Sequence, residues 1–397
     1  MAKNLVVGEF NDSYKPIMDG VGVCVENYTR WLNEKHGTAY AIVPYVPRYR
    51  DSDPFPVVRF PSLPLVVMPP YRLGIPWANP RVGNFLARTP FSLVHSHSPF
   101  VAGQMAHRTA LRHNVAHVTT FHTKYWEDAH RFLRSKRLVD LFIRRIVRFY
   151  DSCDAVWTPS ESTRAVLRSY GFQGEIIIAP NGSDIGVPTS EQRKRYREDG
   201  ARLTNTPDNT FVFLFVGQHR WEKNVELIIR TIARLAVCDQ PGAPIALVFV
   251  GEGYASEMMR KLAHQVGIQG NTRFLGSIVD RERLRALYAR ADLFFFPSIY
   301  DNAPLVMREA AAFGVPTIAA EGTSASEAIT DGKNGFTVPN HPEKAAEILR
   351  RLMNDRDLIT RVGQDAARTI YLGWEQIVDW VAEAYGQIIE TRSRRGT

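Results

Sequence analysis

Hydrophobic residues along the chain form short runs separated by longer amphipathic stretches. An apolar run at residues 4–8 precedes a helix-like pattern at 23–34, and a second apolar run follows at 40–45. This alternation predicts a βαβ unit. Further strands of the first half are expected at residues 93–97, 115–121, 155–158 and 175–179. Helical patterns between most of these runs favour a parallel sheet with crossover helices.

A second series of the same kind follows after a polar, charged interval. Its strands are expected at residues 211–216, 246–251, 273–275, 293–297 and 317–319, each separated by a stretch of helical length. The pattern predicts an α/β protein with two Rossmann-like, doubly wound domains. We place the first domain at 1–182, a linker at 183–208, the second domain at 209–373 and a final helical segment at 374–397. Both domains are expected to offer their post-strand loops to a shared cleft.

One interval interrupts the first series. Residues 54–80 are rich in proline, which removes backbone donors and clashes with a preceding helical turn. We therefore predict a long surface loop there.

The stretch from Phe294 to Pro316 is the most informative part of the chain. A buried-looking strand ends in a loop, and an alanine-rich helix follows. Backbone N–H groups at Ala303, Leu305 and Val306 would lie near the helix start, where the helix dipole favours a bound anion such as a diphosphate. Seven residues separate Asp301 on the loop from Glu309 on the helix, so the two carboxylates could accept hydrogen bonds from hydroxyls at opposite ends of a ligand.

Composition narrows the class of protein. The 397 residues, 45% of them hydrophobic, suit two α/β domains, and the net charge of +8 indicates an anionic partner. The three cysteines, Cys24, Cys153 and Cys238, lack metal-ligand spacing and indicate neither a disulfide framework nor a zinc site. No run of about 18 apolar residues occurs, so we expect neither a signal peptide nor a transmembrane helix. We expect no nucleic-acid partner, since no reader motif is present.

No metal-binding pattern stands out either. Asp51 and Asp53 match a paired-aspartate metal-binding motif, but they lie in a proline-flanked loop. No other carboxylate or histidine cluster has ligand spacing. We therefore expect no cofactor and no strictly required metal.

Several segments together resemble the family-four retaining glycosyltransferases, which have the GT-B fold. The acidic, seven-residue, acidic signature at Asp301 to Glu309 is similar to that of the family, as is the strand-loop element from Phe215 to Asn224. Other agreeing segments, in the expected order, are 250–253, 274–276, 331–335 and 374–375. The resemblance covers nearly the whole chain, and it looks closest to the bacterial diacylglycerol and other lipid glycosyltransferases.

The resemblance implies a role for each matching residue. It makes Lys223 the ligand of the donor diphosphate, Glu309 that of the ribose and Asp301 that of the transferred sugar, with His122 near the sugar and the acceptor. The implied catalytic residues are His122, Lys223 and Asp301. The implied donor-binding set is Gly22, Gln218, Arg220, Lys223, Ser277, Ile278, Asp301, Asn302, Ala303, Leu305, Val306 and Glu309. Lys124 and Tyr125 are expected on the acceptor side, and Gly22, in the loop at 19–22, would let backbone approach the phosphate or acceptor closely.

The sequence departs from the family pattern at three positions. Gln218 replaces the usual arginine after the glycine, so charge at the diphosphate would come from Lys223, or from Arg220 shifted along the loop. Asp301 stands where glutamate is usual. Pro304 occupies a position at which the family often has glycine, and proline removes one backbone N–H donor.

A basic helix face is predicted at residues 129–150. At about 100° per residue its arginines share one side, opposite Val139, Phe142, Ile143 and Ile146. These arginines are Arg134, Arg137, Arg144, Arg145 and Arg148. The face is either the solvated side of a core-packed helix or a site of adsorption to anionic lipid, to which Arg392, Arg394 and Arg395 could add.

The sequence and the resemblance together predict a retaining hexosyltransferase of glycolipid biosynthesis. The first domain would bind the acceptor, a membrane lipid such as diacylglycerol, and the second would bind a nucleotide-sugar donor of the UDP-glucose type. The final helix would cross back onto the first domain. Alternatives are a soluble or polyprenyl-linked saccharide acceptor with a GDP-mannose or UDP-sugar donor, and an inactive nucleotide-sugar-binding protein. We expect a cytoplasmic location, with peripheral attachment to the inner face of the plasma membrane as an option.

Overall fold

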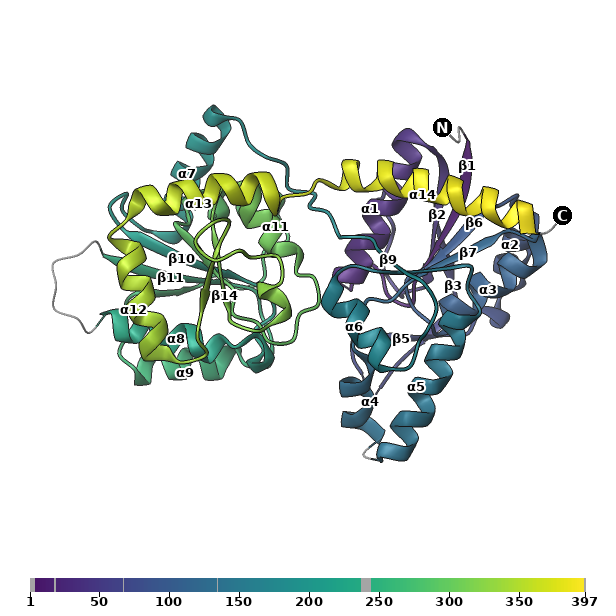
Figure 1. Cartoon of the computed structure of the whole chain (residues 1–397), viewed down its shortest axis with the longest axis horizontal. Coiled ribbons are helices and arrows are strands. Elements are labelled where there is room, and N and C mark those ends of the chain that lie inside the picture. Colours follow the sequence, from purple (N-terminus) through teal and green to yellow (C-terminus); the bar gives the residue numbers. More distant parts are fainter. Residues whose placement is uncertain (1–3, 18, 67, 134, 237–243, 396–397) are drawn as a thin grey trace. The chain divides into compact units, whose positions relative to one another are not determined.

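The computed structural model describes residues 4–17, 19–66, 68–133, 135–236 and 244–395. It divides into two compact units, one made of Met1–Asn181 with Trp374–Thr397 and the other of Gly182–Gly373 (Figure 1). Each unit is a parallel sheet covered by helices, as the alternating pattern predicts. Among the described residues, no helix combines the length and the apolar character that crossing a membrane requires.

The first unit contains a seven-stranded parallel sheet in the order β3-β2-β1-β6-β7-β8-β9. Its strands are β1 Leu5–Phe10, β2 Gly37–Pro44, β3 Val57–Phe60, β6 Leu93–Ser96, β7 Ala116–Thr120, β8 Ala155–Thr158 and β9 Ile176–Ile178, and the separate β4 Ser62–Pro64 and β5 Arg72–Gly74 form a small antiparallel pair. Its helices are α1 Gly20–Lys35, η1 Pro76–Ala78, α2 Pro80–Arg88, α3 Val101–His113, α4 Tyr125–Leu133, α5 Lys136–Asp151, α6 Glu161–Ser169 and α14 Trp374–Arg395. The strand order reverses between β1 and β6.

The second unit has a six-stranded parallel sheet in the order β12-β11-β10-β13-β14-β15. Its strands are β10 Phe211–Val216, β11 Ile245–Val250, β12 Thr272–Phe274, β13 Leu293–Phe295, β14 Thr317–Ala320 and β15 Phe336–Val338. Its helices are α7 Ser190–Thr204, η2 Trp221–Lys223, α8 Val225–Ala236, α9 Ser256–Gln265, α10 Arg281–Arg290, α11 Leu305–Ala312, η3 Ser324–Ser326, α12 Pro342–Met353 and α13 Arg356–Thr369. This is the doubly wound order in which ligands bind where the strand order reverses, here between β10 and β13.

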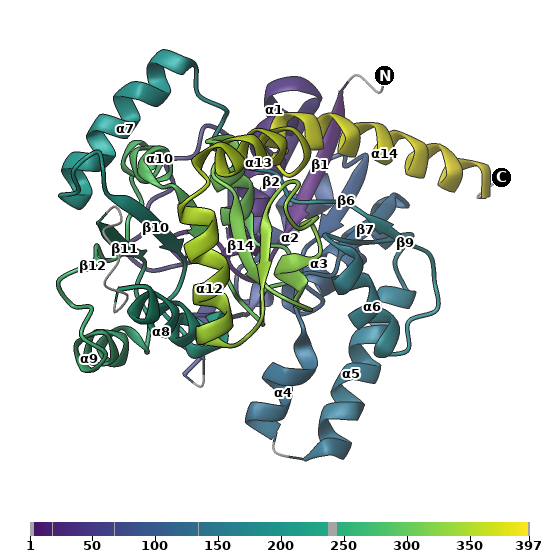
Figure 2. The same ribbon diagram turned by 60° about the vertical axis from the view of Figure 1, so that its left-hand side comes forward.

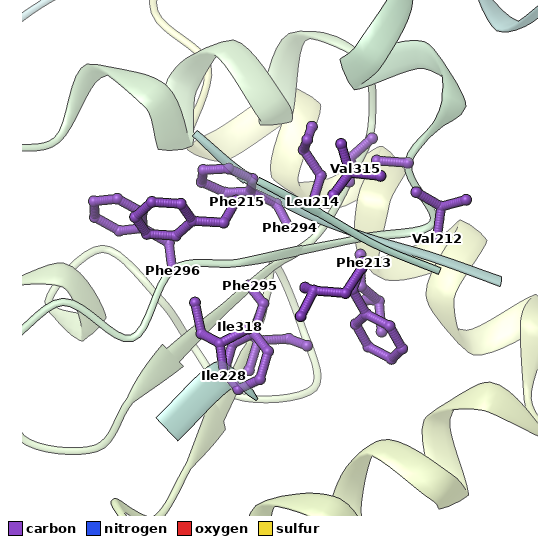
Figure 3. Close-up of a cluster of buried hydrophobic side chains, with 14 of the residues drawn as sticks. Val212, Phe213, Leu214, Phe215, Ile228, Phe294, Phe295, Phe296, Val315 and Ile318 are labelled. Carbon is purple, nitrogen blue, oxygen red and sulfur yellow. The ribbon is translucent and has the colours of Figure 1, made fainter. Parts of the chain in front are cut away.

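Aromatic side chains fill the core of the second unit beside this reversal. The rings of Phe215 and Phe294 both stack on Phe296, with centroids 5.7 Å and 5.6 Å away, and Figure 3 shows the three rings among the aliphatic side chains of the sheet. All three residues are almost fully buried. Burial of such large apolar surfaces stabilises the ends of β10 and β13, from which the loops of the candidate site leave.

The last helix returns to the first unit. Lys35 of α1 forms ion pairs with Glu375 and Asp379 of α14, each at 2.8 Å, and Tyr385 of α14 is completely buried. Figure 1 draws α14 in yellow next to α1. The predicted crossing of this helix back to the N-terminal domain is therefore present.

Two expectations for connecting segments need correction. The proline-rich residues 54–80 contain β3, β4, β5 and η1, because β3 pairs in parallel with β2 as an edge strand and buries Phe60. The stretch expected to be a linker, 183–208, contains α7, which packs on α10 and belongs to the second unit. Tyr196 of α7 is buried and donates a hydrogen bond to Glu282, so this polar-looking helix is anchored.

The predicted basic helix is two helices. α4 ends at Leu133 and α5 begins after its N-cap residue, Ser135. Figure 2 shows α4 and α5 side by side at one end of the first unit. On α5 the arginines are exposed, namely Arg137, Arg144, Arg145 and Arg148, while Val139, Ile143 and Ile146 are buried. Arg134 lies outside the described residues, as does Cys238 of the cysteine set.

Candidate active site

Loops that leave β10 and β13 bring together two residues predicted for the donor. Lys223 ends η2, just after β10, and Asp301 lies in the loop after β13. The Lys223 ammonium contacts both carboxylate oxygens of Asp301, at 2.5 Å and 2.6 Å, and lies 5.3 Å from the centre of the Phe296 ring. Both side chains are mostly buried, with 15% and 20% of their surface exposed. A cation is thereby held at the crevice where α/β sheets bind their ligands.

The third predicted donor residue, Glu309, lies inside helix α11 and is buried. Its carboxylate accepts hydrogen bonds from the Tyr288 hydroxyl at 2.7 Å and from Arg281 at 3.3 Å. Burial raises the pKa of Glu309, while the nearby charge of Arg281 opposes this shift. Arg281 also pairs with Asp184 at 2.7 Å. The position of Glu309 is therefore fixed by α10.

Helix α11 starts where the sequence predicts a helix start. The helix begins at Leu305 after the N-cap residue Pro304, so the N–H groups of Leu305 and Val306 belong to its first turn. Asn302 and Ala303 lie in the preceding loop. Ser324 donates a hydrogen bond to the backbone carbonyl of Asp301 and holds this loop in place.

The remaining residues predicted for the donor differ in how firmly they are held and in how exposed they are. Arg220 lies 3.8 Å from Glu222 and 6.0 Å from the centres of the Tyr254 and Tyr300 rings, so it is held beside the loop. Gln218 is exposed. Ser277, exposed, and Ile278, partly buried, follow β12 in the loop before α10.

Glycines let the loops after β10 and β11 approach each other closely. Gly251 adopts φ +128°, and a Cβ atom there would lie 1.9 Å from the carbonyl oxygen of Gly217. The N–H of Gly251 also donates to the carbonyl of Gly276, at 2.8 Å. A side chain at position 251 would force these loops apart.

We therefore expect Gly251→Ala to destabilise the protein by roughly 2–5 kcal/mol, the sum of an unfavourable φ and an overpacked contact. Chemical denaturation of the two proteins measures this difference. Gly270→Ala is the matched control, because nothing lies within 4 Å of a Cβ atom at that position. Equal stability of the Gly251→Ala variant and the wild type would show that the loops separate at no cost.

In the first unit, His122 follows β7 and joins a buried polar cluster at the ends of β1 and β6. His97 Nδ1 lies 3.1 Å from His122 Nε2, and His97 Nε2 lies 2.8 Å from Glu9 Oε2. The Tyr385 hydroxyl donates to Glu9 Oε1 at 3.1 Å. Glu9, His95 and His97 are completely or almost completely buried. Glu9 is not among the residues predicted from the sequence, although a carboxylate buried in an apolar strand is costly without a partner.

Contacts within this cluster are hydrogen bonds. Glu9, His95 and His97 have the side-chain types of a metal site. However, ligand atoms around a tetrahedral ion at about 2.0–2.2 Å are more than 3 Å apart, whereas Glu9 and His97 approach to 2.8 Å. Asp51 and Asp53 form ion pairs with different partners, Arg59 at 2.7 Å and Lys15 at 2.6 Å.

Two residues expected near the acceptor or phosphate have other surroundings. Tyr125 is buried in the core beside Phe121 and Phe100, so its ring serves packing. Gly22 lies in the first turn of α1 and not in a loop, and its N–H donates to the N-cap residue Asp19 at 2.7 Å. Lys124, which precedes α4, is partly exposed.

An apolar pocket of about 330 Å³ lies between η1, α3 and α5 of the first unit. Exposed Trp77 and Phe100 stand at it, and the side chains of Arg108 and Arg145 border it. The other lining residues are Pro76, Pro99, Val101, Gln104, Met105, Phe142, Ile146 and Phe149. The basic face of α5 therefore adjoins an apolar hollow. Arg392, by contrast, pairs with Asp154, which removes it from any shared basic surface.

The sequence is similar to two domain families. Residues 18–187 match Glycosyltransferase Family 4 and residues 197–369 match Glycosyl transferases group 1. An alpha-monoglucosyldiacylglycerol synthase of Streptococcus pneumoniae is 24% identical over 359 residues, which cover 89% of this chain and 79% of the relative. A D-inositol 3-phosphate glycosyltransferase of Streptomyces griseus is 28% identical over 409 residues, covering 94% and 83%.

Solved structures support the fold. Anabaena Alr3699/HepE in complex with UDP superimposes with a TM-score of 0.73 at 18% identity, covering 96% of this chain and 100% of that one. Sucrose-phosphate synthase from Thermosynechococcus elongatus has a TM-score of 0.76 at 18% identity, with 98% and 100% covered. The two parallel-sheet units and the two matched domains show that the chain belongs to the GT-B glycosyltransferases that combine a family 4 domain with a group 1 domain.

Proposed function

We propose that this glycosyltransferase moves a hexose from a nucleotide sugar, of the UDP-glucose type, to a membrane lipid such as diacylglycerol, with retention of configuration. The carrying observation is the placement of Lys223 and Asp301 at the strand-order reversal of the second unit, beside the N-terminus of α11. A buried cation and a helix N-terminus both favour a diphosphate. The solved relative that contains UDP has the same fold.

Different residues of the second unit would bind the different parts of the donor. Lys223 would bind the diphosphate, Asp301 the transferred sugar and Glu309 the ribose hydroxyls. Because Lys223 and Asp301 contact each other directly, the donor would have to enter between them, the diphosphate taking the cation and a sugar hydroxyl the carboxylate. We assign no metal and no cofactor to this step.

In the proposed reaction the acceptor hydroxyl attacks the anomeric carbon on the face that the diphosphate leaves. The new carbon–oxygen bond forms as the bond to the phosphate oxygen breaks, and the hydroxyl proton passes to the departing diphosphate. No enzyme nucleophile is assigned, and the carboxylates of Asp301 and Glu309 act as ligands of the substrate. His122 of the first unit would lie near the transferred sugar and the acceptor.

The apolar pocket in the first unit supports a lipid acceptor. Its volume of about 330 Å³ falls in the range of small-molecule sites, about 300–1,000 Å³. Arg108 and Arg145 beside apolar walls suit an amphiphile at an anionic surface, where each basic residue contributes about 1 kcal/mol. The relative from Streptococcus pneumoniae is named for a diacylglycerol product. The relative named for inositol phosphate makes a soluble acceptor the second candidate.

We test the acceptor with vesicles that contain diacylglycerol, with and without acidic lipid, against free inositol phosphate and soluble saccharides. Glucose transfer to diacylglycerol, with an α-linked product by NMR, is the expected result. Clear transfer to a soluble acceptor, unaffected by lipid, would overturn the lipid assignment. Tight donor binding with no transfer to any acceptor would instead favour a nucleotide-sugar-binding protein.

Truncating the aromatic side chains at the pocket should impair use of the lipid. We expect the double variant Trp77→Ala, Phe100→Ala to raise the KM for vesicle-bound diacylglycerol about tenfold, because each ring presents exposed apolar surface. The KM for the donor should stay within twofold. Leu111→Ala, which removes an exposed apolar side chain of α3 outside the pocket, is the control. A lipid KM equal in all three proteins would exclude the pocket from acceptor binding.

A further inference from the structure

We propose that Glu9 and His97 are positioning residues that decide which ring nitrogen of His122 carries the proton. The three side chains form one line of hydrogen bonds, from Glu9 Oε2 through both nitrogens of His97 to Nε2 of His122. The rings of His97 and His122 are stacked, with centroids 5.4 Å apart. The inference rests on the proposed function only through the role of His122.

Both histidines in this line are neutral. Burial lowers the pKa of His97 to about 3, and burial together with His97 lowers the pKa of His122 well below its usual value. A neutral imidazole carries one proton, so one nitrogen donates and the other accepts. Each hydrogen bond therefore dictates the direction of the next one.

When Glu9 is ionised, it accepts from Nε2–H of His97. Nδ1 of His97 is then an acceptor, so His122 must donate from Nε2 and its Nδ1 carries no proton. When Glu9 is protonated, it donates to His97, His97 donates from Nδ1 to His122, and the proton of His122 must be on Nδ1. The charge of Glu9 thus converts His122 Nδ1 between an acceptor and a donor, with no atom moving appreciably.

Groups from every element around Glu9 set its charge. His95 of β6 and His97, which directly follows β6, face it, as does Tyr385 of α14. Tyr28 of α1 packs edge-on against both histidine rings. Burial raises the pKa of Glu9 to about 8, while the hydrogen bond from Tyr385 pulls it down. The protonated form consequently prevails at neutral pH, and His122 then presents Nδ1–H.

The neighbouring His95 does not take part in this line. Its Nδ1 lies 2.5 Å from the Tyr385 hydroxyl, and its Nε2 lies 2.8 Å from the Thr120 hydroxyl. Because Tyr385 donates to Glu9 Oε1 in either charge state, it accepts from His95 in both. The link through Tyr385 also ties the cluster to α14, so the last helix of the chain helps to set the charge of Glu9.

The test is ¹⁵N NMR of the full chain with labelled histidine, recorded between pH 6 and 10, with His122 assigned from a His122→Asn sample. In the wild type we expect His122 Nδ1 to change from protonated to unprotonated with a midpoint near pH 8. Glu9→Gln should abolish the change, because the amide NH₂ donates to His97 at every pH and keeps Nδ1–H on His122. Tyr385→Phe should move the midpoint to higher pH, since the carboxylate loses a donor.

Glu26→Gln, which removes a carboxylate of the same unit outside the cluster, is the control and should titrate like the wild type. A His122 signal that is identical at all pH values in wild type and Glu9→Gln, or a transition that persists in Glu9→Gln, would overturn the proposal. In assays, kcat of the wild type should fall above about pH 8 and that of Glu9→Gln should not. An NMR switch in a protein without transferase activity would leave the relay intact and refute the proposed function instead.

Discussion

Replacing Lys223 by alanine is expected to lower kcat by about 10²–10³-fold, the effect typical of removing one preorganised group that stabilises developing charge. The negative charge on the diphosphate grows as the glycosidic bond breaks, and Lys223 is the cation that the second unit holds at its strand-order reversal. Initial rates at saturating donor and acceptor measure kcat. Thermal-shift titration with UDP- and GDP-sugars should show that the donor-induced stabilisation is also lost.

Controls separate the charge of Lys223 from its structural role. Lys223→Ala leaves Asp301 without its ion-pair partner, so the variant with both residues changed to alanine shows how much of the loss comes from the carboxylate that has lost this partner. Lys261→Ala removes a surface lysine that pairs with Glu257 within one helix, and should behave like the wild type. If Lys223→Ala retained kcat within twofold, Lys223 would have no part in the departure of the diphosphate.

Replacing Glu309 by glutamine is expected to raise the KM for the donor by about 10–100-fold, with a smaller change in kcat. A hydrogen bond to a charged group contributes about 1.5–3 kcal/mol, and the amide has one acceptor oxygen where the carboxylate has two. Tyr288 and Arg281 already occupy both carboxylate oxygens, so the remaining lone pairs are the ones that ribose hydroxyls would use. Donor titrations at saturating acceptor measure the KM.

Tyr288→Phe distinguishes the positioning of Glu309 from its direct contact. This variant keeps the carboxylate but removes one hydrogen bond that orients it, so its KM should rise less than that of Glu309→Gln. Glu257→Gln, at an exposed helical position, is the control. A donor KM unchanged in Glu309→Gln would mean that the ribose binds elsewhere.

Much of the candidate donor site could be predicted from local patterns. The strand, loop and helix around Asp301 and Glu309 are contiguous in the sequence, and strand β10 with its following loop is contiguous up to Lys223. Because parallel strands present their carboxyl ends at one edge, chemistry-bearing residues after strands are expected to gather there. The same locality explains why the arginines of α5 were correctly expected on one face.

Errors arose where local composition was a poor guide. The polar composition of α7 indicated a linker, yet Tyr196 and the packing against α10 anchor it. The prolines that flank β3 led to the prediction of a loop, but an edge strand tolerates proline at its ends. The roles of Gly22 and Tyr125 were predicted from local motifs. The structure shows that Gly22 lies in a helix and that Tyr125 is buried in the core.

The sequence by itself determined that the chain forms two α/β domains and that Asp301 and Glu309 flank one helix start, because periodicity and strand ends are properties of consecutive residues. Lys223 and His122 were implied by the resemblance to the glycosyltransferase family. Only the tertiary structure decided the partners of these groups. The contact between Glu9 and Tyr385 joins residues 376 positions apart. Such contacts depend on the order of strands in the sheet and on where the last helix packs, and hydrophobic periodicity contains no information about either.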